Sequence, residues 1–301
     1  MGVILMALVL VAVVGMYWWA NSIFGRIERV DVSEVLASGG DGTNYLIVGS
    51  DTREVLDPND PELAEEQGPA GQRSDTMMVL RFEGGKAKLL SIPRDLYVSI
   101  AETDKHGKIN AAYNGGPKRL IQTISDNLGI NITRYIEVDF VSFAGLVDGL
   151  GGITINFEHP AYDLNSGLNV ADTGPVKLDG EQALGYVRSR HYVEIIDGEE
   201  VEDPTADLGR IQRQQQFLQA VFAKLGDTGN PFTLATTASK VTDGLRIDDK
   251  MSLIDAMRFA WRLRGLTPEP QKLETSNERN DSGAVLILDE EASKPILDQF
   301  R

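Results

Sequence analysis

Two aspartates of this sequence stand at the ends of short apolar runs, where polar side chains of neighbouring strands can converge. Asp51 follows the run 45–48, and Asp75 precedes the run 76–82. Carboxylates in such positions can bind one hard cation, because Mg²⁺ (or Mn²⁺) takes oxygen ligands and is often shared with substrate phosphates. Each aspartate could instead cap a turn through its own side chain. The pair therefore predicts a metal site only if phosphate-binding groups lie nearby.

Arginines accompany both aspartates and a further strand end. Arg53 and Arg73 each lie two residues from one of the aspartates, and Arg94 follows the end of the run 86–92. Arginine stays charged, and its planar guanidinium can donate two parallel hydrogen bonds to a phosphate group. Ion pairs with surface carboxylates are the ordinary alternative, and such pairs stabilise a protein little.

A second group of cations lies in the later half of the chain. Arg188 and Arg190 are two residues apart, so an extended segment would point both side chains to one face. Arg210, Arg213 and Gln214 have helical spacing and are expected on one helix face. Acidic side chains are favoured near the start of a helix, so an arginine there needs another reason. These positions predict an anion pocket in a chain of formal net charge -16.

The composition excludes several classes of function. A chain of 301 residues with a net charge of -16 repels nucleic acid in general. It contains no cysteine, which excludes disulfides, thiolate metal sites and cysteine nucleophiles. The histidines His106, His159 and His191 lack the spacing of metal ligands. No nucleophile elbow, Walker loop or dinucleotide fingerprint occurs in the sequence.

The amino-terminal segment predicts a membrane anchor. Residues 1–25 contain no charged side chain, and residues 3–20 are almost continuously apolar. At about 1.5 Å per residue, such a helix is at the short end of a bilayer span. Tyr17, Trp18 and Trp19 stand at its end, where aromatic side chains favour the interface. A cleaved signal peptide is the alternative, but a basic start and a small-residue cleavage site are both missing. We predict an anchor over 1–25 and a juxtamembrane linker over 26–42.

Strand-like and helical segments alternate along the rest of the chain. Apolar runs typical of strands occupy 45–48, 76–82, 86–92, 135–138, 153–157 and 285–288. Amphipathic helices are expected at 120–128, 140–150, 179–187, 208–225 and 252–263. Asp139 is placed to cap the second of these, and Ser252 with Asp255 has the spacing of a capping box. The alternation predicts one α/β (α+β mixed) domain over 43–301, with a central mixed sheet flanked by helices.

Six blocks of the sequence, in this order, resemble those of the LytR-CpsA-Psr family. The first two are 47–53 (IVGSDTR) and 73–78 (RSDTMM), and the next two are 91–95 (SIPRD) and 108–113 (KINAAY). The last two are 187–190 (VRSR) and 207–215 (DLGRIQRQQ). Six blocks in order are far more specific than any one of them, and the resemblance covers residues 45 to 225.

The resemblance implies an enzyme of cell-wall assembly. Such proteins transfer a glycopolymer, for example teichoic acid, capsular polysaccharide or arabinogalactan, from a polyprenyl-pyrophosphate carrier to peptidoglycan, and the product is a phosphodiester. Asp51 and Asp75 would bind Mg²⁺. The residues expected to contact the pyrophosphate are Arg53, Lys108, Arg213 and Gln214. The residues expected to act in the transfer itself are Arg94, Asp95, Arg188, Arg190 and Arg210, with Asp95 as a candidate general base.

The resemblance also implies a lipid site and a location. A hydrophobic tunnel would hold the isoprenoid chain, and its lining could include Phe140, Phe143, Phe217, Val221 and Phe222, although ordinary core packing explains these positions equally well. The protein would be a single-pass protein of the cell membrane, with its catalytic domain outside the cytoplasm.

Three other functions remain open on the sequence. Hydrolysis of a polyprenyl pyrophosphate would use the same residues, with water as the acceptor. A non-catalytic lipid-binding scaffold of the envelope would keep the tunnel and the arginines but could dispense with paired aspartates. A transcriptional regulator would need a basic recognition surface, which is not visible in this acidic chain.

Overall fold

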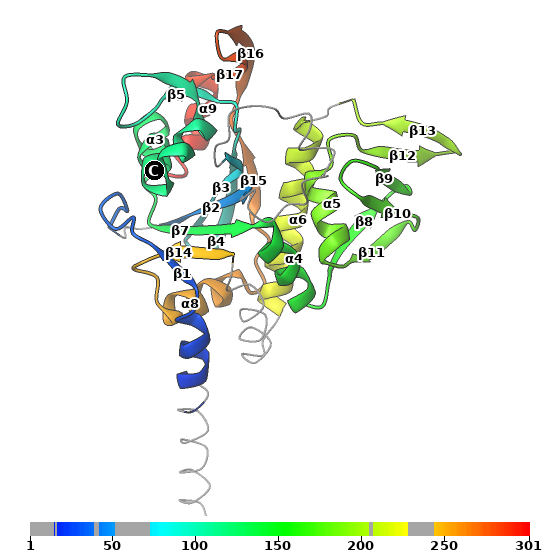
Figure 1. The fold of residues 1–301 in the computed structure, drawn as a ribbon, viewed down its shortest axis with the longest axis horizontal. Helices are drawn as coiled ribbons and strands as arrows, with labels where there is room; N and C mark the ends of the chain where they lie inside the picture. Colours follow the sequence, from blue (N-terminus) through cyan, green and yellow to red (C-terminus); the bar gives the residue numbers. More distant parts are fainter. Residues whose placement is uncertain (1–14, 16, 39–41, 52–72, 205–206, 228–243) are drawn as a thin grey trace, which may run out of the picture.

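The computed structural model describes residues 15, 17–38, 42–51, 73–204, 207–227 and 244–301. For residues 51, 73–75, 140–141, 207–208 and 226–227 it describes the backbone alone. A seven-stranded mixed sheet lies at the centre (Figure 1). In spatial order its strands are β1 Glu28–Val30, β14 Leu245–Asp248, β7 Arg134–Asp139, β2 Thr43–Asp51, β3 Arg73–Glu83, β4 Lys86–Ile92 and β15 Glu269–Lys272.

Both pairing directions occur in this sheet. The pairs β1–β14, β2–β7 and β4–β15 are parallel, whereas β14–β7, β2–β3 and β3–β4 are antiparallel. The predicted central mixed sheet is therefore confirmed. In the hairpin turn between β3 and β4, Gly84 and Gly85 have φ values of 56° and 75°. Glycine adopts these left-handed angles without the steric cost that a Cβ would bring.

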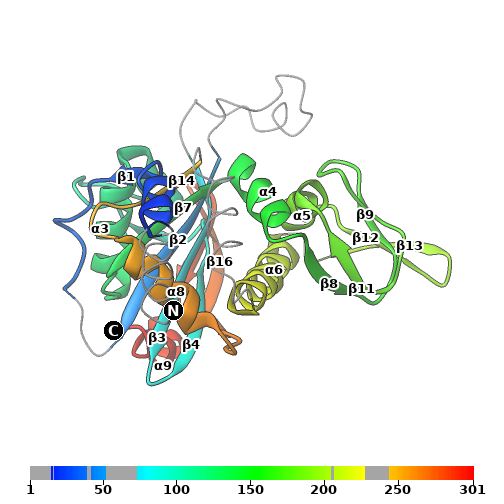
Figure 2. The ribbon, with the colours of Figure 1, turned by 90° about the horizontal axis from the view of Figure 1, so that it is seen from below.

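Helices cover both faces of the sheet (Figure 2). Side chains alternate along each strand, so Leu46 of β2 packs into one apolar layer and Tyr45 into the other. The first layer contains the 3-10 helix η2 Ile109–Gly115, α3 Pro117–Leu128 and α9 Glu290–Leu297. The second contains α6 Asp207–Asp227 and α8 Leu253–Leu263.

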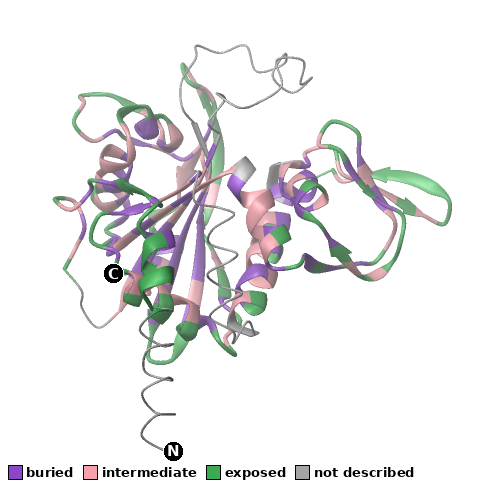
Figure 3. Ribbon diagram, turned by 60° about the horizontal axis from the view of Figure 1, so that its bottom comes forward, coloured by how far each residue is buried: buried purple, intermediate pink, exposed green. Residues whose placement is uncertain are grey.

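A smaller lobe packs on the outer side of α6. It consists of α4 Phe140–Gly149, α5 Gly180–Arg188, the pair β8 Ile153–Phe157 and β11 Gly174–Leu178, and the sheet of β10 Leu168–Val170, β9 Ala161–Asp163, β12 Val193–Ile196 and β13 Glu199–Glu202. Phe217 of α6 is buried in the core of this lobe, and Phe222 of the same helix is buried against the central sheet. Helix α6 thus joins two apolar cores. Figure 3 shows the buried central strands and the exposed strand β13.

Two short hairpins complete the described chain, β5 Tyr97–Ser99 with β6 His106–Lys108, and β16 Thr275–Asn280 with β17 Gly283–Leu288. The predicted helix caps are confirmed. Asp139 accepts a hydrogen bond from the Ser142 backbone at 2.7 Å, and Ser252 and Asp255 form a reciprocal capping box on α8. These side chains bind backbone N–H groups that have no partner inside their helices.

The segment predicted as a linker, 26–42, differs in the structure. Residues Glu28–Val30 form an edge strand of the central sheet, and Val30, Val32 and Leu36 are buried in its core. The prediction failed here because a three-residue strand is too short to show periodicity and its partner β14 lies far along the chain. The folded unit therefore begins before residue 43.

Val32 offers a direct test of this boundary. Its side chain is 1% exposed, so Val32→Ala removes two buried methyl groups and is expected to lower the free energy of unfolding by about 2 kcal/mol. Urea unfolding measures the change, and Asp31→Ala, an exposed neighbour, is the control. If Val32→Ala lowers the free energy of unfolding no more than Asp31→Ala does, the segment is a linker and not part of the folded unit.

The predicted anchor over 1–25 falls mainly on residues 1–14 and 16, which lie outside the described residues. Residues 17–24 are helical. Within the described chain, no helix has both the length and the apolarity needed to cross a membrane.

Candidate active site

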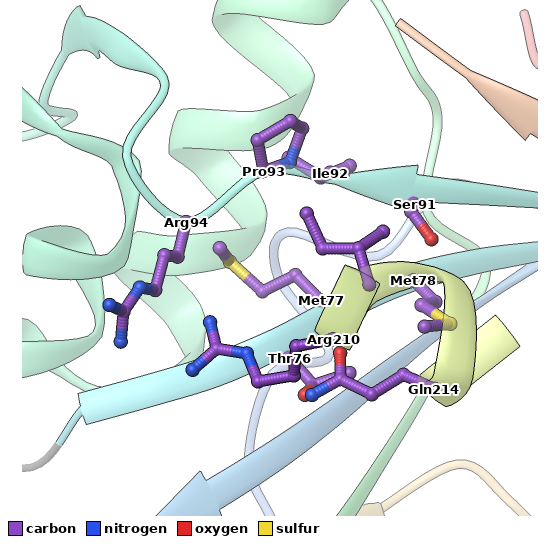
Figure 4. A pocket seen from close by; sticks show the side chains of 10 residues that line it. Thr76, Met77, Met78, Ser91, Ile92, Pro93, Arg94, Arg210 and Gln214 are labelled. Carbon is purple, nitrogen blue, oxygen red and sulfur yellow. The ribbon is translucent and has the colours of Figure 1, made fainter. Parts of the chain in front are cut away.

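A pocket lies where β3 begins, β4 ends and the first turns of α6 pass over them (Figure 4). The empty space between these elements is about 290 Å³, open solvent included. Its lining residues are Thr76, Met77, Met78, Ser91, Ile92, Pro93, Arg94, Arg210, Ile211 and Gln214. Three predicted site residues, Arg94, Arg210 and Gln214, thus meet in one cavity although they come from distant parts of the sequence.

The sheet and α6 fix the positions of these side chains. Met77 pairs with Ile92 across β3 and β4, and Pro93 ends the strand because it has no N–H to donate. Gln215 donates a hydrogen bond from Nε2 to the Ser91 hydroxyl at 2.8 Å, which attaches α6 to β4. Arg210 is only 4% exposed. A cation this buried gives the pocket an electrostatic preference for anions that an exposed arginine would not provide.

Two further predicted residues adjoin the pocket through ion pairs. The carboxylate of Asp95 lies 2.7 Å from Lys108 Nζ and 3.5 Å from Arg94 Nε. The backbones are also joined, since Ile109 N–H donates to the Leu96 carbonyl at 2.8 Å. The 108–113 block and the 91–95 block therefore form one unit. Since Asp95 is shared by two cations, the geometry favours a role in holding Arg94 and Lys108.

A buried polar network contacts the 108–113 block through the hydroxyl of Tyr113. Glu137 of β7 has no exposed surface, and it accepts hydrogen bonds from the hydroxyls of Tyr113 and Tyr135. Arg246 of β14 donates to the same carboxylate at 3.2 Å. A buried charge is tolerated only when it is paired and hydrogen-bonded, and Glu137 meets this condition. The sequence patterns did not identify Glu137, because it alternates with apolar residues as an ordinary strand residue would.

The arginine pair at 188 and 190 is arranged differently from the prediction. Arg188 is the last residue of helix α5 and Ser189 is its C-cap, so the segment is not extended. Both arginines are half-buried. Gln214, which lines the pocket, donates from Nε2 to the Val187 carbonyl at 3.2 Å. The end of α5 is thereby attached to the pocket wall one residue before Arg188.

A residue that the sequence patterns missed, Asp163 of β9, holds this arginine-bearing turn. Its carboxylate is buried, with 1% of the residue exposed. It accepts hydrogen bonds from the Ser189 hydroxyl at 2.6 Å and from the backbone N–H groups of Asn165 at 2.9 Å, Ser166 at 3.3 Å, Arg190 at 3.1 Å and His191 at 3.0 Å. One carboxylate therefore fixes the backbone on the far side of Arg188.

The charge of Asp163 is stabilised by these donors. Burial raises the pKa of the carboxyl, but the hydrogen bonds from Ser189, His191, Asn165 and Ser166 outweigh burial and leave the pKa below its usual range. The close packing that brings the donors together needs Gly185 of α5. A Cβ there would lie 2.9 Å from the backbone nitrogen of Leu168, a distance at which the two segments would have to separate.

Arg213 serves the same turn and not the pocket. Its guanidinium donates to the Ser189 carbonyl and to the Asp203 carboxylate, both at 2.8 Å, and it stacks over the Tyr192 ring at 4.5 Å. The predicted shared face with Gln214 is therefore wrong in part. Consecutive helix residues differ by about 100° in direction, so Arg213 points to the smaller lobe while Gln214 points to the pocket.

The predicted metal ligands can be placed only through their backbone. Asp51 at the end of β2 pairs with Arg73 at the start of β3, and Asp75 lies at an irregularity of the same pair, next to Thr76 of the pocket. The side chains of Asp51, Arg73 and Asp75, and all of Arg53, lie outside the described residues. Among described side chains, no cluster of three or more acidic or histidine residues is arranged to hold a metal. The register places the backbones of Asp51 and Asp75 near each other at the pocket edge, and the metal site stays a prediction.

The apolar residues expected along a lipid tunnel are part of packed cores. Phe217, Val221 and Phe222 are buried, and the Phe143 ring lies 4.7 Å from that of Phe217. The side chain of Phe140 lies outside the described residues. The tunnel stays a prediction.

The sequence is similar to those of known proteins. The sequence matches the LytR_cpsA_psr family over residues 15–299. It is 33% identical over 306 aligned positions to a probable cell wall biosynthesis protein, LcpB of Corynebacterium glutamicum, covering 100% of this chain and 70% of that protein. It is 29% identical over 268 positions to the polyisoprenyl-teichoic acid–peptidoglycan teichoic acid transferase TagU of Enterococcus faecalis, covering 84% and 78% of the two chains. The regulatory protein MsrR of Staphylococcus aureus is 33% identical over 258 positions, 79% of this chain and 73% of that protein.

Solved structures share the fold. The LytR-Csp2A-Psr enzyme from Actinomyces oris superposes with a TM-score of 0.72 at 25% identity, covering 91% of this chain and 96% of that one. TagV of B. subtilis superposes with a TM-score of 0.67 at 22% identity, covering 87% and 97%. The mixed sheet with flanking helices is thus the fold of these proteins as well.

Proposed function

Because this chain belongs to the LytR-CpsA-Psr family, we propose that it transfers a cell-wall glycopolymer from a polyprenyl-pyrophosphate carrier to peptidoglycan, with a phosphodiester link in the product. Its similarity to a polyisoprenyl-teichoic acid–peptidoglycan teichoic acid transferase supports this proposal. The observation that carries it in this chain is the pocket. Buried Arg210 and half-buried Arg94 and Gln214 line one pocket, beside the strand segments that bear Asp51 and Asp75.

The proposed reaction exchanges one P–O bond for another. A sugar hydroxyl oxygen of peptidoglycan bonds to the phosphorus that carries the glycopolymer. The bond between this phosphorus and the bridging oxygen breaks, and polyprenyl phosphate leaves with the bridging oxygen and its electron pair. The hydroxyl proton passes to a carboxylate, for which Asp95 is the candidate, or to solvent.

The residues of the chain supply position and charge. Phosphoryl transfer needs little covalent chemistry from the protein, so catalysis rests on orientation and on neutralising the charge of the phosphoryl oxygens. Arg210 and Arg94 would donate to these oxygens, with Arg188, Arg190 and Lys108 approaching from the adjoining segments. Arg53 and the amide of Gln214 would contact the pyrophosphate, and Arg213 would act by holding the Ser189 turn. Mg²⁺ bound by Asp51 and Asp75 would neutralise further charge.

The proposed location is the cell membrane. The uncharged apolar residues 1–25 would form a single-pass anchor, and the folded domain would lie outside the cytoplasm, where peptidoglycan is assembled. The net charge of -16 argues against binding nucleic acid, and hence against a regulator that acts on DNA.

The test uses the full chain in lipid vesicles with a synthetic polyprenyl-pyrophosphate glycan and peptidoglycan fragments. We expect Mg²⁺-dependent release of polyprenyl phosphate and appearance of the glycan on the fragments. Chelation of the metal is expected to stop both, and Asp75→Ala to do the same in the presence of metal. Asp104→Ala, an exposed aspartate, is the control and should leave the rate unchanged.

The outcomes separate the competing functions. Release of polyprenyl phosphate without any glycan on the fragments would identify a polyprenyl-pyrophosphate hydrolase. Binding of the donor without release, whatever acceptor is offered, would identify a lipid-binding scaffold. Transfer that proceeds at the same rate in chelator would remove Asp51 and Asp75 from the mechanism.

A further inference from the structure

Helix α8 exposes a stripe of large apolar side chains. Ile254, Met257 and Trp261 are 47%, 53% and 73% exposed. They are spaced by three and four residues, so they lie on one side of the helix. Leu263, on the opposite side, is buried against the central sheet. Single exposed apolar residues are common, but a contiguous stripe on one helix indicates an interaction surface.

The stripe lies beside the segment that leads out of the N-terminal apolar run. Phe24 and Ile27 share a buried cluster with Met251, which lies just before α8, and with Leu263 at the end of α8. Arg29 donates a hydrogen bond to the Met251 carbonyl. Figures 1 and 2 show α8 at the end of the domain from which the N-terminal helix emerges. A bilayer entered by the N-terminal run would therefore meet α8.

The charged residues around the stripe are mainly cationic. Arg258 and Arg262 flank it on one side, Arg264 follows the helix, and Arg26 stands at the end of the N-terminal helix; all four are exposed. Asp255 lies 3.7 Å from Arg258 but also caps the helix. In a chain of net charge -16, this local excess of arginine complements anionic headgroups. Exposed Tyr17 and Trp18 are of the type that favours the membrane interface.

We infer that α8 lies in the interface of an anionic lipid bilayer, with Ile254, Met257 and Trp261 inserted between the headgroups. The inference rests on the anchor in the proposed function and adds a second contact between protein and membrane. An anchor alone leaves a domain free to rotate and tilt, whereas two contacts fix its orientation. The pocket is then held at a constant height above the surface that carries a polyprenyl substrate.

The chain has three tryptophans, so a single-tryptophan reporter is available. The full chain with Trp18→Phe and Trp19→Phe, which leaves Trp261, is reconstituted into vesicles of phosphatidylcholine and phosphatidylglycerol. We expect loss of Trp261 fluorescence when the acyl chains carry bromine close to the headgroup, and a smaller loss when bromine lies at the chain ends. We also expect a smaller loss in vesicles without phosphatidylglycerol.

Two variants serve as controls. Leu164 is 87% exposed in the smaller lobe, and Leu164→Trp combined with Trp18→Phe, Trp19→Phe and Trp261→Phe should show no quenching. Met257→Gln with Arg258→Gln changes only exposed side chains and should weaken quenching of Trp261 while leaving the chain folded.

Flotation of the same vesicles tests separately whether the chain is anchored in the bilayer. A chain that floats with the vesicles while Trp261 stays unquenched would overturn the inference and leave the anchor intact. A blue-shifted emission without bromine quenching would show that a second protein chain covers the stripe, which also overturns it. A chain that does not float would overturn the anchor and the inference together.

Discussion

Replacing Arg210 with alanine is expected to lower kcat for glycopolymer transfer by about 10²–10³-fold, the loss typical when one preorganised donor to a developing charge is removed. Arg210 is almost fully buried and lines the pocket. Its charge is therefore little screened by water, and it is oriented before the substrate arrives. Arg210→Lys keeps the charge but loses the bidentate fork, so an intermediate loss is expected.

The measurement is steady-state transfer from a polyprenyl-pyrophosphate glycan, with kcat and KM determined separately. Gln212→Ala is the matched control, because Gln212 lies on the same helix but is exposed. Circular dichroism and Tm show whether the variants fold. If Arg210→Ala raises KM and leaves kcat unchanged, the residue binds substrate and transition state equally, and its assignment to the transfer step is wrong.

The sheet was predictable where its strands carry recognisable apolar runs. Strands β2, β3 and β4 have such runs and were placed correctly, and so were the caps of α4 and α8. Strands β1, β14 and β15 have only three or four residues and owe their place in the sheet to partners far along the chain. No local pattern records such a partner. This is why the folded unit extends beyond the predicted boundary at residue 43.

The candidate site was predictable for residues that lie at strand ends and on one helix. Arg94, Arg210 and Gln214 meet as expected. The residues that hold the arginine-bearing turn at Ser189 were not predictable, because their role depends on contacts between segments. In the sequence, Asp163 precedes residues typical of a turn. In the structure its carboxylate accepts a hydrogen bond from the hydroxyl of Ser189, which is 26 positions away. Arg213 has helical spacing with Arg210, but its partners belong to another lobe.

Asp163→Ala is expected to lower the free energy of unfolding by about 3 kcal/mol, because buried donors lose a charged acceptor. Five hydrogen bonds converge on this carboxylate, among them those from Ser189 and from the N–H of Arg190. Transfer should fall as well, since a shift of about 1 Å in a positioning element can cost 10²-fold in rate. Asp163→Asn keeps one acceptor oxygen and should recover part of both losses.

Urea unfolding and transfer kinetics measure the two effects. Asp172→Ala, an exposed aspartate of the same lobe, is the control and should change neither. If Asp163→Ala lowers stability but transfer by the folded fraction keeps its wild-type kcat and KM, Asp163 supports the lobe and has no part in placing Arg188 and Arg190.

The pH dependence of stability gives an independent check on Asp163. Its folded-state pKa lies below the usual range because the surrounding donors outweigh burial, whereas the unfolded chain has the ordinary value of about 3.9. Because the folded-state pKa is depressed, the charged carboxylate contributes its full stabilisation of the fold above about pH 5. This stabilisation declines as the pH falls through the folded-state pKa. The stability difference between wild type and Asp163→Asn should therefore be constant near neutrality and shrink below about pH 4. A difference that stays constant into that acid range would show that the carboxylate charge contributes nothing, and that Asp163 holds the arginine-bearing turn by shape alone.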